Sequence, residues 1–172
     1  TLDTYLHFIR DLILLEPTGV EFTIRGAFPV WSYRQTDARL LGIDASGYYQ
    51  WAPNWETRHK VSIAKGTDLD QDLPLINMPA PITRNEVIFR KTEWKQLLIG
   101  LESTYVFRQN EFPPNIFVFS PSEQEEVELE INTPPEAYHL LALRAEMEFD
   151  LPGSLVLNSG LTITNLLDTR YR

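Results

Sequence analysis

Apolar and polar residues alternate along several segments of this chain, and the connections between those segments are short and long in turn. Residues 139–150 show the alternation best, because leucine, alanine, methionine and phenylalanine fall at every second position, with charged residues between most of them. Successive side chains of a β-strand point to opposite faces, so such a segment forms a strand with one apolar and one charged face. The pattern predicts an all-β protein of antiparallel strands.

We expect seven strands from this pattern. Their expected ranges are 2–15, 36–51, 55–65, 83–91, 95–108, 139–150 and 154–166. The first range also fits the apolar stripe of a helix, so its type stays open on its own residues, and the neighbouring strands favour a strand. The turn signal Glu16-Pro17-Thr18-Gly19 should end it, and an irregular stretch broken by Gly26 and Pro29 should follow.

The lengths of the connections sort them into two groups. Residues 52–54, 92–94 and 151–153 connect strands within about three residues, and their Pro, Asn and Gly suit tight turns. The other three connections are longer than a dozen residues, and the longest spans 109–137. In an up-and-down antiparallel sheet, every tight turn then lies at one rim and every long loop at the other. This arrangement is typical of a transmembrane β-barrel wall.

Aromatic residues gather near the three tight turns. They are Tyr49, Trp51, Trp55, Trp94 and Phe149. Such rings favour the boundary between hydrocarbon and water, so they fit an aromatic girdle of a membrane barrel. The alternative is that these rings cover strand ends, as they do in other β proteins.

Composition excludes several classes of protein. The net charge of −9 argues against nucleic acid as a partner, because such proteins carry a basic surface. The lack of cysteine excludes disulfides and thiolate chemistry. No apolar run reaches the length of a membrane-spanning helix. Because the chain starts at Thr1 without a methionine, we interpret it as a piece of a larger or processed protein.

Catalysis finds little support in the residues. The three histidines, His7, His59 and His139, lie in separate expected strands and lack the spacing of a metal site. Ser159 lacks the surroundings of a nucleophile elbow. We therefore expect no enzyme and no cofactor.

Two acidic stretches lie in the long loops. Asp68, Asp70 and Asp72 have the spacing that begins a calcium loop, but Leu73 stands where an EF-hand needs glycine and no glutamate follows at the twelfth position. A looser divalent-cation site remains as a hypothesis. The second stretch is either a solvated surface or a cation site near lipopolysaccharide, and it consists of Glu123, Glu125, Glu126, Glu128 and Glu130.

Four stretches carry motifs in a characteristic order: 33–44 (YRQTDARLLGID), 73–84 (LPLINMPAPITR), 131–138 (INTPPEAY) and 161–171 (LTITNLLDTRY). The first resembles the Gln-Thr-Asp-Ala run, followed by a glycine and an acidic residue, that occurs late in TonB-dependent outer-membrane receptors. The second and third are similar to proline-containing approaches to strands in that family. The fourth resembles its penultimate strand, although Leu167 stands where phenylalanine is common.

The resemblance implies that the chain is the C-terminal portion, over residues 1–172, of a plugged 22-stranded barrel. The plug domain, the TonB-contacting segment and a last strand ending in an aromatic residue would then lie outside this sequence. The implied localisation is the outer membrane of a Gram-negative bacterium, with lipid and lipopolysaccharide around the barrel. The implied function is TonB-dependent uptake of a small metal complex, most often a ferric siderophore, with the plug and the remaining strands as partners.

The resemblance also assigns roles to particular side chains. In such a barrel the polar faces of the strands would look into the lumen and contact the plug, through Asp44, Tyr48, Glu102, Arg144, Glu146 and Glu148. Ligand contacts would come from external loops, with candidates chosen by side-chain type: Arg25, Trp31, Tyr33, Arg34, Phe112 and Phe117. The alternative is a soluble β-sandwich or small barrel that binds carbohydrate or protein, whose apolar face would be an internal core.

Overall fold

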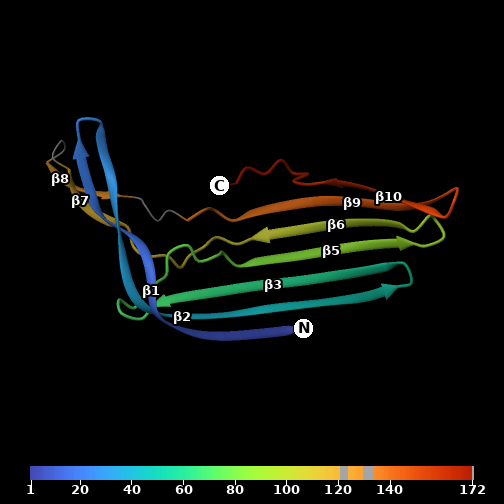
Figure 1. Ribbon diagram of the computed structural model, residues 1–172, viewed down its shortest axis with the longest axis horizontal. Helices are drawn as coiled ribbons and strands as arrows, with labels where there is room; N and C mark the ends of the chain where they lie inside the picture. The colour runs from blue at the N-terminus through green and yellow to red at the C-terminus, as the bar shows by residue number, and fades with distance from the viewer. Residues whose placement is uncertain (121–123, 130–133, 172) are drawn as a thin grey trace.

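The computed structural model describes residues 1–120, 124–129 and 134–171. Among the described residues the main sheet has eight strands, and seven of them follow one another in chain order, each antiparallel to its neighbours (Figure 1). They are β1 (Leu2–Thr23), β2 (Gly26–Ala52), β3 (Trp55–Asp68), β5 (Ile82–Lys91), β6 (Leu97–Val106), β9 (Tyr138–Leu151) and β10 (Leu155–Ile163). The predicted all-β, up-and-down sheet is confirmed, and the first range is a strand.

Three shorter strands lie in the long connections. β4 (Leu73–Pro74) pairs with β3, while β7 (Ile116–Ser120) and β8 (Glu125–Leu129) form a separate hairpin between β6 and β9. In the part of the chain that the structure describes, no helix has the length and apolar character needed to cross a membrane.

The first connection differs from its prediction. Residues 16–35 are not an irregular loop, because β1 and β2 continue as one long antiparallel hairpin that turns at Ile24 and Arg25. The expected turn at Pro17 and Gly19 is instead a register shift between those residues, and pairing resumes beyond it. A β-bulge absorbs one extra residue and bends the strand, so a turn-like sequence can remain within a strand.

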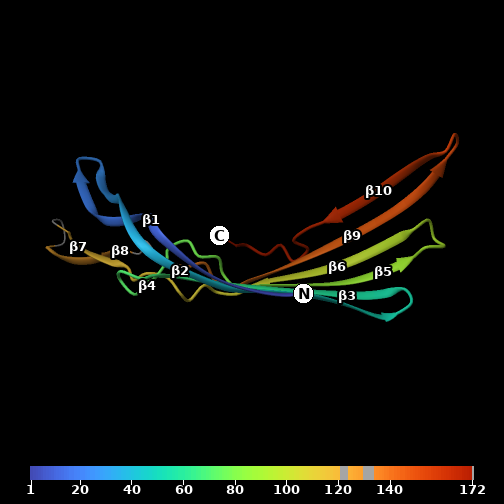
Figure 2. The ribbon, with the colours of Figure 1, turned by 60° about the horizontal axis from the view of Figure 1, so that its bottom comes forward.

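A second bulge changes which residues of β1 share a face. The register shifts between Ile9 and Leu12, and Asp11 takes a positive φ of 57° there. The extra residue moves Leu12 to the face opposite Phe8, whereas uninterrupted period-two alternation would put both on one face. Beyond the bulge the hairpin bends away from the main sheet (Figure 2).

The two rims differ as predicted. Tight turns at residues 53–54, 92–96 and 152–154 lie at one end of the sheet, and the β1–β2 extension and the long loops lie at the other (Figure 1). The second turn is longer than expected, because Lys95 and Gln96 adopt positive φ and β6 begins at Leu97. Gly153, with φ of 81°, supplies the left-handed conformation of the third turn.

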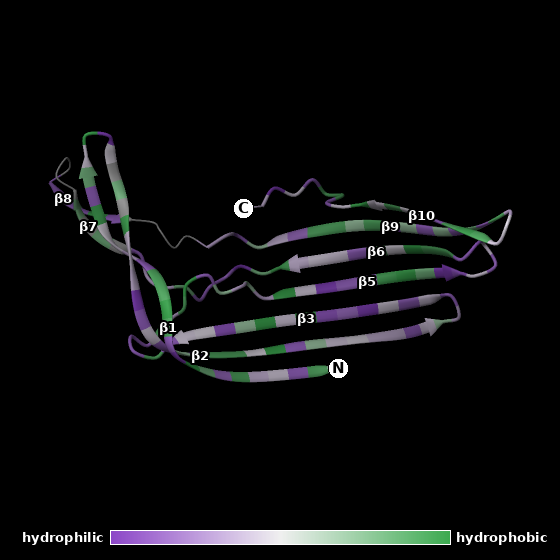
Figure 3. Ribbon diagram, in the orientation of Figure 1, coloured by the Kyte–Doolittle hydropathy of each residue, from purple (hydrophilic) through white to green (hydrophobic). Residues whose placement is uncertain are grey.

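The main sheet is a single curved layer (Figure 2). Bands of hydrophobic and hydrophilic residues alternate along its strands, as period-two patterning requires (Figure 3). We call the face that carries Asp44, Glu86 and Arg144 the inner face, and the face that carries Leu41, Val87 and Leu143 the outer face; cross-strand register assigns the other residues to one or the other.

Burial distinguishes the two faces. Most of the buried strand residues belong to the inner face, where curvature brings side chains together: Thr36, Ala38, Asp68, Ile88, Leu98 and Thr104. Large apolar side chains of the outer face are exposed, for example Leu6 at 58% and Leu161 at 61%. In the described part of the chain, no second sheet covers this outer face. The inner face is therefore the concave and polar side of the layer.

Candidate functional site

The six residues predicted to face a lumen share the inner face. Tyr48 pairs with Arg58 on β3, and Glu102 pairs with Glu86 on β5. Register places the others on the same side, since Asp44 pairs with Ser62 and residues 144, 146 and 148 of β9 alternate with its outer positions. Their common face is an observation, and their contact with a plug or a lumen remains a prediction.

Ion pairs connect four strands across the middle of the inner face. Arg144 on β9 donates from Nη2 to Glu86 Oε1 over 2.9 Å, and Arg58 Nη1 on β3 lies 3.9 Å from Glu86 Oε2. Arg84 Nε lies 3.5 Å from Glu102 Oε1 on β6. The Glu86 side chain is only 15% exposed and stands at the centre of this arrangement.

Glu86 was missed by sequence reasoning. In residues 83–91 the alternation is weak, and only Val87 and Phe89 indicate a face. Its position in the strand could have identified it. Successive side chains of a strand point to opposite faces, so Glu86 lies on the face opposite Val87, between two strands that carry charged residues. A carboxylate at such a site is held by arginines because an unpaired charge on a crowded face is costly.

Gly100 on β6 leaves the space that the Glu86 carboxylate occupies. A Cβ at position 100 would lie 2.9 Å from Glu86 Oε1, so the carboxylate, which Arg58 and Arg144 hold in place, would have to shift. We expect Gly100→Val to destabilise the folded protein by about 1–3 kcal/mol, measured by urea unfolding in lipid vesicles. Gly160→Val is the matched control, because a Cβ there meets only ordinary contacts at 3.6 Å and beyond. Equal stability of the two variants would contradict the role given to Gly100.

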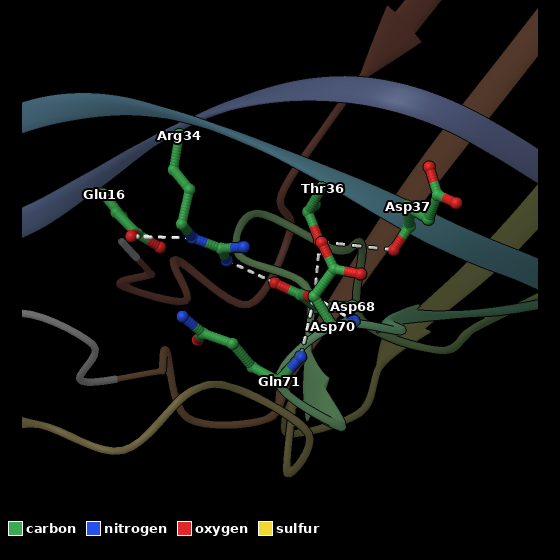
Figure 4. A network of polar contacts seen from close by, with 7 residues as sticks. All are labelled: Glu16, Arg34, Thr36, Asp37, Asp68, Asp70 and Gln71. Atoms are coloured by element: carbon green, nitrogen blue, oxygen red, sulfur yellow. Dashed lines mark hydrogen bonds and ion pairs between the residues drawn. The ribbon is translucent and has the colours of Figure 1, made fainter.

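A second polar network lies at the base of the β1–β2 extension (Figure 4). Arg34 on β2 donates from Nε to Glu16 Oε1 on β1 over 2.8 Å, and from Nη2 to Asp68 at the end of β3. The Thr36 hydroxyl lies 2.6 Å from Asp68 Oδ1 and 3.0 Å from Asp70 Oδ2. The network ties the extended hairpin to the connection after β3.

Asp68 is the most enclosed member of this network, with a side chain only 3% exposed. It also accepts hydrogen bonds from the backbone N–H groups of Asp70 and Gln71. Burial alone would raise the pKa of the Asp68 carboxyl, but the hydrogen bonds from Thr36, Arg34 and the two N–H groups outweigh burial and lower that pKa. The carboxylates of Glu16 and Asp68 raise the pKa of the Arg34 guanidinium.

These shifts predict a pH dependence for the hairpin. A carboxyl whose pKa is depressed in the folded state adds stability above its ordinary pKa, and that stability is lost as the pH falls through the depressed value. We expect cleavage of residues 12–36 by pepsin to accelerate as the pH falls below the ordinary pKa of an aspartate, about 4. Asp68→Asn should flatten this pH profile and allow rapid cleavage throughout, whereas an unchanged profile would show that Asp68 does not hold the hairpin.

A pocket of about 250 Å³ lies beside the Arg34 network. Three connections from the long-loop rim line it: the β1–β2 hairpin, the segment after β3 and the segment after β6. Its polar side includes Glu16, Arg34 and Gln71, and its apolar side includes Leu14, Leu75 and Pro113. The pocket can hold a small molecule with both polar and apolar parts.

The six candidate ligand residues are not brought together. Arg25 lies at the turn of the hairpin, and Trp31 and Tyr33 are exposed on β2, at 44% and 79%. Phe112 lines a separate pocket of about 330 Å³, and Phe117 is exposed on β7. Of the six, Arg34 alone lines the pocket of the polar network. Their role in binding a ligand remains a prediction.

The acidic residues of the long loops either contact other side chains of the protein or are exposed. Asp68 is held by Arg34 and Thr36, and Asp72 is exposed with a φ of 54°. Among the described residues, no three His, Asp or Glu side chains form a group that could hold a metal ion. The hypothesis of a loop-bound cation gains no support from this geometry. Glu125, Glu126 and Glu128 are exposed on β8, while Glu123 and Glu130 lie outside the described residues.

Comparison with known proteins supports the fold. The sequence matches no protein-family model and no curated protein. Among solved structures, the chain is similar to the copper transporter OprC, with a TM-score of 0.75 and 18% sequence identity. The similarity covers 99% of this chain and 23% of the OprC chain, so the chain spans about a quarter of that protein. At this identity the likeness concerns the fold alone, which is that of a segment of a transmembrane β-barrel wall.

Proposed function

We propose that this chain is part of the barrel wall of a Gram-negative outer-membrane transporter that takes up a small metal complex. One observation carries the proposal: a single curved layer has an uncovered apolar face and an ion-paired polar face. An extended apolar surface is costly in water, and charged side chains are costly in hydrocarbon. A membrane wall with lipid outside and a wet or protein-filled interior satisfies both faces.

The dimensions of β9 agree with this proposal. Its outer face is bounded by His139 and Phe149, with leucine, alanine and methionine between them. Ten residues of strand extend about 33 Å. At the usual tilt of about 45°, this length spans about 24 Å along the membrane normal, which matches the apolar band of an outer-membrane barrel. A soluble β-sandwich would need a second layer over this face, and the described residues supply none.

The open edges of the sheet support the proposal that further barrel strands are partners of this chain. β1 and β10 each pair with one strand in the main sheet, so each has one edge open. In hydrocarbon every backbone N–H and C=O needs a partner, so neighbouring barrel strands are required at both edges. We propose that these strands and a plug complete the barrel, and that TonB supplies the energy, as the resemblance to TonB-dependent receptors implies.

The cargo is proposed at two levels. The name of OprC supports a metal as the transported element, and the sequence resemblance favours a ferric siderophore. The pocket at the long-loop rim, with both polar and apolar walls, suits an organic metal complex better than a bare ion. No covalent chemistry is needed for this role.

Uptake by cells with and without the full-length gene tests the proposal. We expect the protein in the outer-membrane fraction, and we expect the gene to increase accumulation of labelled iron from at least one ferric siderophore in a panel. Increased accumulation of labelled copper alone would support the proposal of metal transport and reject a ferric siderophore as the cargo. A protein found in the water-soluble fraction would reject the transporter altogether.

A further inference from the structure

Two basic residues lie at the border of the outer face, next to a zone without charged residues. Arg39 on β2 and Lys65 on β3 adjoin this zone on the side of the long loops. Register places both on the outer face, because Lys65 pairs with Leu41, and Arg39 is two residues from Leu41 in continuous pairing with β3. We call Arg39 and Lys65 the border pair. The adjoining zone holds no Asp, Glu, Lys or Arg, and it comprises the outer-face positions within residues 41–49, 55–63, 83–89, 97–105, 139–151 and 155–163.

The border pair lies at the external boundary of the membrane if the proposed function is right. Lys65 is ten residues along β3 from Trp55, and Arg39 is ten residues along β2 from Tyr49. The same length bounds the apolar face of β9, where it spans about 24 Å along the membrane normal. Trp55 and Tyr49 lie near the tight turn between β2 and β3. The border pair therefore lies at the opposite boundary, where hydrocarbon ends and lipid headgroups begin.

The Arg39 side chain has no partner among the described residues. Its Nε is enclosed and makes no hydrogen bond there, and the guanidinium forms no ion pair with a described carboxylate. The nearby Asp37 contacts the backbone instead, because its Oδ1 accepts from the N–H of Asp11 over 3.1 Å. Arg39 is half-buried and faces Phe8 across one strand boundary and Thr67 across the other. Unused donors in such a place are costly, so Arg39 needs an acceptor from outside this part of the protein.

Lys65 supplies a second cation that an incoming anion can share. Its Nζ lies 2.6 Å from Glu111 Oε1, but the two side chains are 47% and 46% exposed. An exposed ion pair of this kind is weak, so a more highly charged anion can displace the Glu111 carboxylate. Lys65 and Arg39 are diagonal neighbours on adjacent strands, at a spacing of roughly 7–8 Å that long side chains can bridge. Both cations can therefore contact one anion.

We propose that the border pair binds a phosphate group on the headgroup of a lipid in the external leaflet. Arginine binds phosphate through paired N–H donors, and lysine binds it as a point charge. The position of the pair favours a lipid over free phosphate, because the acyl chains of the same molecule would contact the adjoining apolar side chains, such as Leu41 and Ile63. The ring of Phe8, which is 67% exposed beside Arg39, suits the same boundary. In a Gram-negative outer membrane this lipid is the lipid A portion of lipopolysaccharide.

Binding of lipid A to the full-length protein tests the proposal. The protein is purified from outer membranes in a mild detergent, delipidated and titrated with bis-phosphorylated lipid A, while native mass spectrometry counts the bound lipid. Arg39→Met should lower the affinity about tenfold or more, because hydrogen bonds between charged groups are lost. Lys65→Met should lower it about threefold, because an exposed charge contributes less. Lipid A from which the phosphates have been removed should bind weakly, and equally to wild type and both variants.

Lys60→Met is the matched control for these variants. Lys60 is an exposed lysine of the same strand, but it pairs with Ser46 on the inner face, so its replacement should leave the affinity unchanged. An equal loss in Lys60→Met, or unchanged affinity in Lys65→Met, whose exposed side chain is replaced without disturbing the fold, would overturn the proposal. Complete displacement of lipid A by millimolar inorganic phosphate would also overturn it, in favour of a site for free phosphate.

Failure of the proposed function gives a different result. A wild-type protein that is absent from the outer membrane would reject the proposed function and, with it, the lipid site. A protein that resides in the outer membrane but binds lipid A independently of its phosphates would reject the role of the border pair alone.

Discussion

Replacing Leu143 by arginine is expected to weaken insertion of the barrel into the membrane by about 2–4 kcal/mol. Leu143 lies near the middle of β9 on the outer face, between Leu101 of β6 and Ile163 of β10. In the proposed orientation all three side chains contact lipid tails, and a guanidinium group at this depth loses its hydration without gaining a partner. Urea unfolding of the full-length protein in lipid vesicles measures the change.

Ala142→Arg is the matched control for this substitution. Ala142 is the adjacent residue of the same strand, but it lies on the inner face, where it pairs with Glu102. An arginine there meets carboxylates and water, so we expect a change below about 1 kcal/mol. If both variants lose the same stability, or if Leu143→Arg folds as a soluble protein, the assignment of the outer face to lipid is wrong.

Replacing Arg34 by methionine is expected to release the β1–β2 extension from the rest of the sheet. The substitution keeps much of the side-chain volume but leaves the nearly enclosed Asp68 carboxylate without its cation. Removing one partner of a buried ion pair costs about 3–5 kcal/mol. We expect the lower end of this range, because Thr36 and two backbone N–H groups still contact Asp68.

Hydrogen exchange measures this release directly. Amides of residues 12–36 should exchange more than a hundredfold faster in Arg34→Met, while amides of β5 and β6 keep their protection. Arg25→Met is the control, since Arg25 lies at the turn of the same hairpin and is exposed. Unchanged exchange in Arg34→Met would mean that strand pairing alone holds the extension, and that the polar network contributes nothing to its position.

Much of the fold follows from period-two patterning alone. The alternation over residues 139–150 identified β9 and assigned its faces, because every second side chain of a strand points the same way. The placement of Asp44, Tyr48 and Glu102 on one face required only correct strands and no knowledge of their partners. The same reasoning predicted the loops at one rim, because short connections force the direction of each following strand.

Other features depend on register and could not be predicted from local patterns. The bulge after Pro17 kept the chain in a strand where proline and glycine indicated a turn, and the bulge after Ile9 changed which residues of β1 share a face. The contact of Arg34 with Asp68 joins residues that are far apart in sequence, and the pairing of β2 with β3 brings them together. The contacts of His59 with Asn85 and of His139 with Ser103 could not be predicted for the same reason, since these residues meet only across strands.

The central claim is that alternate residues of these strands contact lipid, and site-directed spin labelling along β9 tests it most directly. Single cysteines at positions 140 to 148 of the full-length protein, each carrying a nitroxide, report collision with oxygen, which concentrates in lipid, and with a water-soluble nickel complex. The account predicts high oxygen accessibility at 141, 143, 145 and 147 and low oxygen accessibility at 142, 144, 146 and 148. Uniform oxygen accessibility along the strand, or a nickel-accessible surface at the odd positions, would contradict it.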